Sequence, residues 1–284
     1  MGQCFQNAIV KMNGMRVIVK VPPRTPSELA ADYDVPLDVA QAAWDNLHRR
    51  SAVLLVFSGK IGAGKDTVAP LVWDKLHVPK ENRVHEFYAK ALKDEISEVF
   101  SIIRAAESQK DAVAAVMAQM GVTEEMATVS VGYLYDEVRK NLDLTPYIKT
   151  QAVRLVLQYW GTDVRRAQDN NYWVKKTLAS TLHQLAKNKS VQITDNRFPN
   201  ELDAALGAGA YAVRLEVSPE VQAKRIMARD GVEVTQEARN HDSETAMDNY
   251  EFFDVYLNTD DKTPEELAEI IANCLETKAR ERLP

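Results

Sequence analysis

The chain has 284 residues, of which 45% are hydrophobic and 27% are charged, as is usual for a globular protein with a substantial core. No apolar run approaches the roughly 20 residues that a membrane-spanning helix requires, and the N-terminal residues lack a secretion-signal pattern. The formal net charge of −6 argues against non-specific nucleic-acid binding over the whole surface. Cys4 and Cys274 lack metal-ligand spacing, so we expect free thiols in a reducing compartment, the cytoplasm.

Residues 1–50 predict a small N-terminal extension. Thr25-Pro26-Ser27-Glu28 is a capping-type start for a helix, with proline at the first helical position. Two short helices joined by a turn would suit a helix-turn-helix unit, but no basic recognition face is evident. This favours an extension that packs on the rest of the chain or supports a homodimer. The expected elements are strands at 8–10 and 17–19, ended by Pro22-Pro23, and helices at 26–33 and 37–47.

Residues 51–284 alternate short apolar runs with stretches of helical periodicity, which is typical of a parallel sheet wrapped by helices. Residues 105–150 are expected to form an insertion lobe, and the weak periodicity of 121–146 predicts that much of it is loop. Thr263-Pro264-Glu265-Glu266 is a capping box that begins a last amphipathic helix. The predicted strands are 53–58, 84–88, 190–194, 210–217 and 255–258, and the predicted helices are 91–104, 112–120, 151–160 and 172–187.

A phosphate-binding loop follows the first of these strands. Gly59, Gly64 and Lys65 have the spacing of that motif, and an apolar run before them and helical periodicity after them supply its strand–loop–helix context. The glycines would turn backbone N–H groups toward phosphate oxygens at a helix N-terminus, and Lys65 would reach the β- and γ-phosphates. Asp66 stands where serine or threonine is expected. The predicted nucleotide-binding residues are Gly59, Lys60, Gly62, Ala63, Gly64, Lys65, Asp66 and Thr67.

Asp195 and Arg197 form a second candidate, at the end of the predicted strand 190–194. An aspartate at the carboxyl end of a buried parallel strand lies where ligands bind in open α/β sheets. Asp195 could hold Mg²⁺ through water, or accept a proton or hydrogen bond from the substrate. Arg197 offers a planar fork that suits phosphate. The structural alternative is an ion pair between the two residues that closes a loop.

A third candidate lies on the predicted helix 151–160 and just beyond it. Arg154 and Gln158 are four residues apart and would share one helix face, offering a cation for phosphate and an amide for a base. Arg165 and Arg166, expected after a glycine turn, would flank the same pocket or remain solvated on the surface.

Arg225 and Arg229 are also four residues apart, on a helix whose end is marked by Gly231. They predict a lid over residues 218–245 that offsets charge developing on transferring phosphates. The polar stretch that begins at His241 would close this lid, with the histidine in a structural role. Zinc-deaminase, protein-kinase and dinucleotide-binding signatures are missing from the sequence, which excludes those enzyme classes.

Together these segments resemble the bacteriophage-type deoxynucleoside monophosphate kinases of the P-loop kinase superfamily. The resemblance covers residues 52–275 and implies an α/β P-loop kinase fold, with a five-stranded parallel sheet, flanking helices and a mobile lid. It implies transfer of the γ-phosphoryl of ATP, with Mg²⁺, to a deoxynucleoside 5′-monophosphate for phage DNA synthesis in the host cytoplasm. Asp66 is an expected residue in this family. The matching segments are 58–67, 87–93, 157–163, 195–201 and 241–244.

The resemblance, added to the reasoning from the residues, gives each candidate a role. Mg²⁺ would be held mainly through water. The predicted catalytic residues are Lys65, Arg225, Arg229 and Asp195, and the predicted metal-binding residues are Asp66, Thr67 and Asp195. The predicted acceptor-binding residues are Lys93, Arg154, Gln158, Arg165, Asp195 and Arg197.

Two other functions are compatible with the sequence. One is that of a related phage kinase that phosphorylates hydroxymethyluracil within DNA during genome hypermodification. Its phosphate loop would look the same, and residues 1–50 could serve DNA, with a binding affinity that falls steeply with salt. The other is that of a regulatory protein that holds ATP without transferring phosphate.

Overall fold

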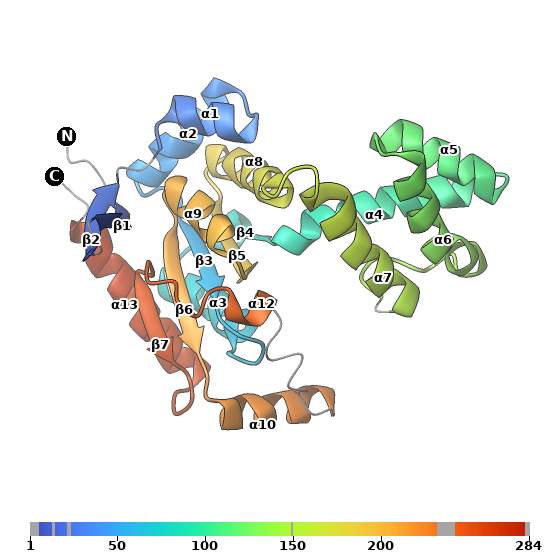
Figure 1. Cartoon of the computed structure of the whole chain (residues 1–284). Coiled ribbons are helices and arrows are strands. Elements are labelled where there is room, and N and C mark those ends of the chain that lie inside the picture. The colour runs from blue at the N-terminus through green and yellow to red at the C-terminus, as the bar shows by residue number, and fades with distance from the viewer. Residues whose placement is uncertain (1–5, 13–14, 22–23, 149, 232–241, 282–284) are drawn as a thin grey trace. The chain divides into compact units, whose positions relative to one another are not determined.

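A computed structural model describes residues 6–12, 15–21, 24–148, 150–231 and 242–281 (Figure 1). Contacts within the chain divide it into two compact units. Unit 1 consists of residues 1–87 and 178–284 and contains the sheets. Unit 2 consists of residues 88–177, is built from helices, and includes the segment 105–150. None of the helices in the described ranges is long and apolar enough to cross a membrane.

The main sheet of unit 1 has the strands β3 (Leu54–Ser58), β4 (Arg83–Glu86), β5 (Ser190–Asn196), β6 (Tyr211–Glu216) and β7 (Val255–Asn258). Their order is β4-β5-β3-β6-β7, and every neighbouring pair is parallel, which confirms the predicted α/β class and five-stranded parallel sheet. The chain leaves β3 toward β4 on one side and leaves β6 toward β7 on the other. A topological switch point therefore lies between β3 and β6, where ligands bind in open α/β sheets.

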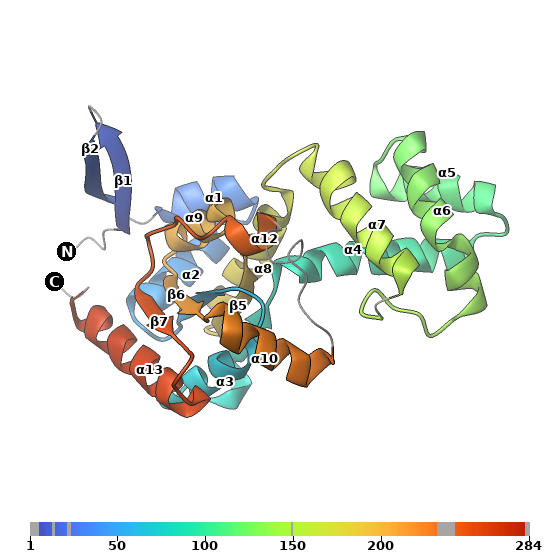
Figure 2. The same ribbon diagram turned by 60° about the horizontal axis from the view of Figure 1, so that its bottom comes forward.

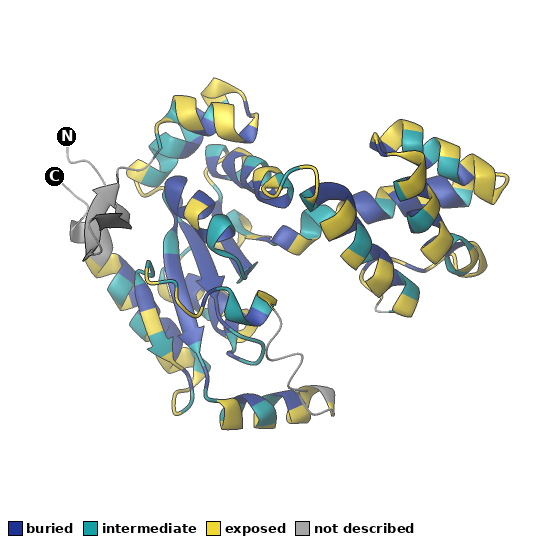
Figure 3. Cartoon of the chain, in the orientation of Figure 1, coloured by how far each residue is buried: buried dark blue, intermediate teal, exposed yellow. Residues whose placement is uncertain are grey.

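Helices cover both faces of this sheet, and β3 is buried along its whole length (dark blue in Figure 3). Leu55 and Phe57 of β3 share one hydrophobic core with Val213 and Leu215 of β6. Burial of each large apolar side chain contributes about 1.5–3 kcal/mol, so this core gives the loop after β3 a firm base. The helices α3 (Lys65–Lys75) and α13 (Pro264–Glu281) contribute to the same core and lie together (Figure 2).

The N-terminal extension is attached to the rest of unit 1 by hydrogen bonds from its two helices. Tyr33 Oη donates to Ala204 O at 3.3 Å, and Asn46 Nδ2 donates to Leu185 O at 2.8 Å. These contacts join α1 (Pro26–Tyr33) and α2 (Leu37–His48) to α9 (Pro199–Gly207) and α8 (Tyr172–Ala186). The extension also contains the predicted antiparallel strand pair, β1 (Gln6–Met12) and β2 (Met15–Val21). Unit 1 is completed by a 3-10 turn (Lys80–Asn82), α10 (Pro219–Asp230) and α12 (Asp242–Thr245).

Both predicted capping boxes are confirmed. The Thr25 side chain accepts from Glu28 N, and the Glu28 carboxylate accepts from Thr25 N at 2.7 Å. At the start of α13, Glu266 N donates to Thr263 Oγ1 at 3.2 Å, and Thr263 N donates to Glu266 Oε2 at 2.8 Å. These bonds satisfy backbone N–H groups that have no partner within the helix, so each helix begins at a fixed residue.

Unit 2 has a hydrophobic core of its own, built around large side chains such as Phe100, Leu134 and Trp160. Its helices are α4 (Tyr88–Ala105), α5 (Gln109–Met120), α6 (Glu124–Lys140) and α7 (Gln151–Tyr159), followed by a π-helical segment (Trp160–Arg166). The sequence predicts a strand that ends at Tyr88. In the structure Tyr88 instead begins α4, and the strand β4 ends at Glu86.

Two expectations for unit 2 are wrong. The segment 121–146 is not mainly loop, because α6 occupies most of it and buries Ala127, Val131, Leu134 and Val138 on one face. Their spacing is helical, but intervening glycine, threonine and serine residues weaken the pattern. The expected turn at Gly161 is also absent: α7 continues directly into the π-helical segment, where Gly161 is buried against Leu92.

Candidate functional site

The loop between β3 and α3 has the backbone that the phosphate-binding motif requires. Gly62 and Gly64 have φ angles of 79° and 88°, in the left-handed region that favours glycine. A Cβ atom on Gly59 would lie 2.4 Å from Leu215 O of β6, so no larger residue fits there without a shift. Gly64 caps the N-terminus of α3, and no other atom lies within 4 Å of where its Cβ would be. The loop is therefore held against β6 and remains open beside the first turn of α3.

Lys65 is the first residue of α3 and its side chain is held under this loop. Its Nζ donates to Gly59 O at 2.6 Å and to Lys60 O at 3.1 Å, and the residue is only 8% exposed. No carboxylate in the described part of the chain lies within ion-pair distance of Nζ. Burial, and next the positive charge of Arg197, lower the pKa of Lys65 to about 8. A buried ammonium that contacts only carbonyl oxygens is suited to an incoming anion.

Arg197 lies beside the same loop, bridged to it by Glu244 of α12. The Arg197 guanidinium pairs with Glu244 Oε1, and it also donates to Ser243 O at 3.3 Å. The other carboxylate oxygen, Glu244 Oε2, accepts from the backbone N–H of Ile61 at 2.7 Å. Glu201 fixes the backbone at the end of β5, since its carboxylate accepts from Arg197 N at 2.8 Å. Arg197 is therefore positioned by Glu244 and Glu201.

A buried arginine on β6 adds positive charge beneath the loop. Arg214 is 2% exposed; its Nη1 donates to Ser58 Oγ at 3.0 Å, and its Nε pairs with Glu216 at 2.5 Å. Asp248 links this arginine to the loop, because it lies 3.4 Å from Arg214 Nη2 and 2.9 Å from Lys60 Nζ. Lys60, predicted to bind nucleotide, therefore forms an ion pair within unit 1.

The helix α10 supports the loop from its other side. Gln222 Nε2 donates to Ile61 O at 2.9 Å, and Arg225 Nη1 donates to Gly62 O at 3.2 Å. Arg225 also donates two hydrogen bonds to Thr259. Its Nη1 donates to Thr259 Oγ1 at 2.9 Å, and its Nη2 donates to the Thr259 carbonyl oxygen at 2.7 Å. Arg225 thus holds the loop backbone, whereas Arg229 is exposed near the end of α10. Residues 232–241 of the predicted lid, which include His241, lie outside the described residues.

The predicted metal-binding residues lie around the start of α3 and the end of β5. Asp66 and Thr67 are exposed, and Asp195 is half-buried. Both carboxylates interact electrostatically with His85 of β4, whose Nε2 lies 3.0 Å from Thr194 Oγ1. Partial burial lowers the pKa of His85, while Asp66 and Asp195 act in the opposite direction. Within the described ranges, no three histidine, cysteine or carboxylate side chains are arranged to hold a metal ion.

Asn196, the last residue of β5, is paired in register with Ser58 at the end of β3. The residue is 1% exposed, and neither its Oδ1 nor its Nδ2 has a hydrogen-bond partner among the described residues. A buried amide in a protein is nearly always hydrogen-bonded, so such an exception marks a site of strain or a missing polar partner. This amide lies next to β3, the strand that carries the glycine-rich loop.

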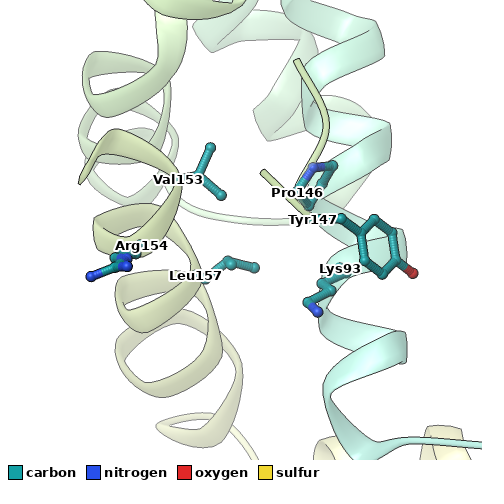
Figure 4. A pocket seen from close by; sticks show the side chains of 6 residues that line it. All are labelled: Lys93, Pro146, Tyr147, Val153, Arg154 and Leu157. Atoms are coloured by element: carbon teal, nitrogen blue, oxygen red, sulfur yellow. The ribbon is translucent and has the colours of Figure 1, made fainter. Parts of the chain in front are cut away.

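Lys93 and Arg154, two of the predicted acceptor-binding residues, line one cavity in unit 2 (Figure 4). The cavity has a volume of about 330 Å³, and Lys93 Nζ lies over the Tyr147 ring, 4.5 Å from its centroid. Val153 and Leu157 point from α7 toward Tyr147, whereas the Arg154 guanidinium extends in the opposite direction (Figure 4). Arg154 and Gln158 are both exposed, as expected for two residues on one solvent-facing side of α7.

Arg165 does not have the predicted position beside a substrate. It is 7% exposed, inside unit 2, where its Nε pairs with Glu95 Oε2 at 2.8 Å and its Nη2 donates to Met120 O at 3.0 Å. The guanidinium also lies over the rings of Trp160 and Tyr172. Its ion pair and both of these hydrogen bonds lie within unit 2, so we reassign Arg165 as a residue that stabilises this unit.

Sequence reasoning missed three residues at the loop: Arg214, Glu244 and His85. A charged residue within the apolar strand 210–217 was a signal for Arg214, since a buried strand seldom keeps an unpaired charge. Glu244 gave no such signal, because its partner Ile61 lies 183 residues away and contributes only a backbone N–H. His85 was predicted only as part of the strand 84–88.

Comparison with known proteins adds no family to this picture. No protein-family model matches the chain, and no curated protein is similar to it in sequence. The function is therefore inferred from the geometry of the site and from the resemblance of its motifs.

Proposed function

We propose that this chain is a phosphotransferase that moves the γ-phosphoryl group of ATP onto a deoxynucleoside 5′-monophosphate in the cytoplasm. One observation carries the proposal: Lys65 is buried at the N-terminus of α3, and its partners among the described residues are carbonyl oxygens of a glycine-rich loop. Such a loop, placed after β3 at the switch point of a parallel sheet, supports assignment of unit 1 to the P-loop kinase fold.

The donor site would use backbone N–H groups as well as side chains. The N–H groups between Gly59 and Lys65, together with the Lys65 ammonium, fit the phosphates of ATP, and the space beside Gly64 is open. ATP supplies the phosphoryl group, and Mg²⁺ neutralises charge on its phosphates. Mg²⁺ binds oxygen ligands and keeps several waters, so Asp66, Thr67 and Asp195 would hold it partly through water.

The acceptor phosphate would be bound by Arg197, which lies close enough to Lys65 to lower its pKa. Its guanidinium can offer two parallel N–H groups to one phosphate. Asp195, two residues earlier, would orient the acceptor. On unit 2, Arg154 and Gln158 of α7 and Lys93 of α4 would offer two cations and an amide for nucleotide contacts.

Charge stabilisation and positioning would account for most of the rate, as is general in phosphoryl transfer. Arg225 would act through the loop backbone, because it binds Gly62 O and Thr259. Arg229 keeps its proposed role at the lid.

The test is to incubate the full chain with ATP and Mg²⁺ and with each deoxynucleoside monophosphate in turn, then with duplex DNA containing hydroxymethyluracil. We expect ADP and one deoxynucleoside diphosphate, with turnover lost in Lys65→Ala while the protein stays folded. Phosphate transfer to DNA alone would establish the hypermodification kinase instead. ATP binding without ADP formation on any acceptor would indicate a regulatory protein. Unchanged turnover in Lys65→Ala would remove the phosphate-loop assignment.

A further inference from the structure

The carboxylate of Glu244 lies where a bound anion would be expected. Glu244 is only 9% exposed, although α12 is a short helix whose neighbouring Asp242 is exposed. One carboxylate oxygen accepts from Ile61 N of the loop at 2.7 Å, and the other pairs with the Arg197 guanidinium. Its negative charge also acts on Lys65. The carboxylate thus interacts with three groups that the donor and acceptor phosphates would use.

The position of this carboxylate has an electrostatic reason. The loop N–H groups, the N-terminus of α3, Lys65 and Arg197 together form a positive site. A carboxylate offers two oxygens to N–H donors in the same way that a phosphate does. Glu244 therefore supplies the counter-charge that the site lacks. A triphosphate would bring several negative charges to the same place, and like charges at close range repel strongly.

We propose that Glu244 is a built-in competitor for phosphate: its carboxylate occupies the loop in the nucleotide-free protein and must leave before a nucleotide can bind. The proposal rests on the phosphate-binding role of the loop given above. A ligand that binds only the Glu244-released state has its affinity reduced by the fraction of protein in that state. If Glu244 occupies the loop in about nine-tenths of the free protein, affinity is reduced about tenfold.

A second role for Glu244 must be separated from this one. The same contacts could position Arg197 and the loop for catalysis, in which case removing the carboxylate would weaken nucleotide binding. The two roles predict affinity changes of opposite sign. Asp242 provides a matched control, because it belongs to the same short helix and carries the same charge but is exposed.

The experiment is isothermal titration calorimetry of the full chain with metal-free ATP and, separately, with tripolyphosphate, which has no base. The variants are Glu244→Gln, which keeps the size of the side chain, Glu244→Ala, and the control Asp242→Asn. We expect both Glu244 variants to bind both anions about tenfold more tightly than the wild type. The control should bind as the wild type does, which would show that general charge removal is not the cause. Thermal unfolding of each variant checks that it is folded.

The contradicting results are distinct for the two proposals. If the wild type binds ATP and transfers phosphate, but both Glu244 variants bind with equal or weaker affinity, the competitor role is wrong and the proposed function stands. If Asp242→Asn tightens binding as much as Glu244→Gln does, occupancy of the loop is not the cause and the competitor role is again wrong. If neither the wild type nor the Glu244 variants bind either anion, both proposals fail.

Discussion

Lys65 in unit 1 and Arg165 in unit 2 are two cations buried to nearly the same extent, at 8% and 7% exposure. Arg165 is matched by the buried Glu95 carboxylate, and two aromatic rings lie against its guanidinium. Within the described part of the chain, the ammonium of Lys65 is hydrogen-bonded to the carbonyl oxygens of Gly59 and Lys60 and to no carboxylate. The pKa of Lys65 is lowered to about 8, which means that its charged form is incompletely stabilised by the protein.

Under the proposed function, the difference separates a charge that stabilises the fold from one that is kept for a ligand. A buried ion pair loses much of its Coulombic gain to desolvation, and removing one partner leaves the other uncompensated. Arg165 and Glu95 therefore depend on each other. Among the described residues Lys65 has no ion-pair partner, and the charges of Asp66 and Glu244 offset only part of the lowering of its pKa. Under the proposed function, a bound phosphate would complete its stabilisation.

The largest effect is expected from Lys65→Met, which keeps the length of the side chain without its charge. Loss of one charged donor to a transferring phosphoryl group lowers turnover by about 10²–10³-fold or more. Because the charge is not paired with a carboxylate, stability at pH 7 should be unchanged or higher. Single-turnover transfer from labelled ATP and urea unfolding measure the two quantities. A large stability loss with normal turnover would reverse the contrast.

A loss of stability is expected from Glu95→Ala. This change leaves Arg165 buried without its carboxylate, which costs about 3–5 kcal/mol. Asp169→Ala is the control, because it breaks an ion pair with Lys175 whose side chains are 36% and 51% exposed, and such pairs contribute at most about 1 kcal/mol. Urea unfolding, with hydrogen exchange to locate the change in residues 88–177, measures both. Equal losses in the two variants would show that the Glu95 network is not structural.

An effect on the acceptor is expected from Arg197→Ala. A hydrogen bond to a charged group contributes about 1.5–3 kcal/mol, so KM for the monophosphate should rise by about 10- to 100-fold. Arg49→Ala, which removes a largely exposed arginine paired with Asp45, is the control and should leave KM unchanged. Steady-state kinetics with each substrate varied separates the two sites. An effect confined to ATP would place Arg197 at the donor site.

The smallest effect concerns pH. Phosphate binding favours the protonated form of Lys65, which predominates at pH 7 and below and is lost as pH rises through its pKa of about 8. Affinity for metal-free ATP should therefore fall about tenfold between pH 7 and pH 9, with proton uptake on binding at the higher pH. Lys65→Met should lack this dependence. Calorimetry in buffers of different ionisation enthalpy measures affinity and proton uptake together, and a flat profile in the wild type would argue against contact with phosphate.

The fold of unit 1 and the position of its loop could be predicted because both depend on local pattern. Short apolar runs predicted the strands, and the spacing of Gly59, Gly64 and Lys65 predicted a loop whose positive φ angles the structure confirms at Gly62 and Gly64. Capping boxes predicted where two helices begin. Each of these signals lies within a few residues of the element that it determines.

The pairing of charges could not be predicted, because it is made between distant segments. Arg165 looked like a ligand-binding arginine, and its partner Glu95 lies 70 residues away. Glu244 was assigned to a lid, and its contact with Ile61 became apparent only in three dimensions. The helix α6 was missed for a different reason, since its buried face is narrow and includes the polar Ser130.

The most direct test of this account is the pKa of Lys65 itself, measured by NMR of ¹³C-labelled lysine side chains with Lys65→Met used to assign the signal. The account predicts a pKa of about 8 in the nucleotide-free protein and a rise toward the ordinary value of 10.5 when ATP is bound. A pKa near 10.5 without nucleotide, or one that ATP does not change, would contradict the claim that this buried lysine is kept for phosphate.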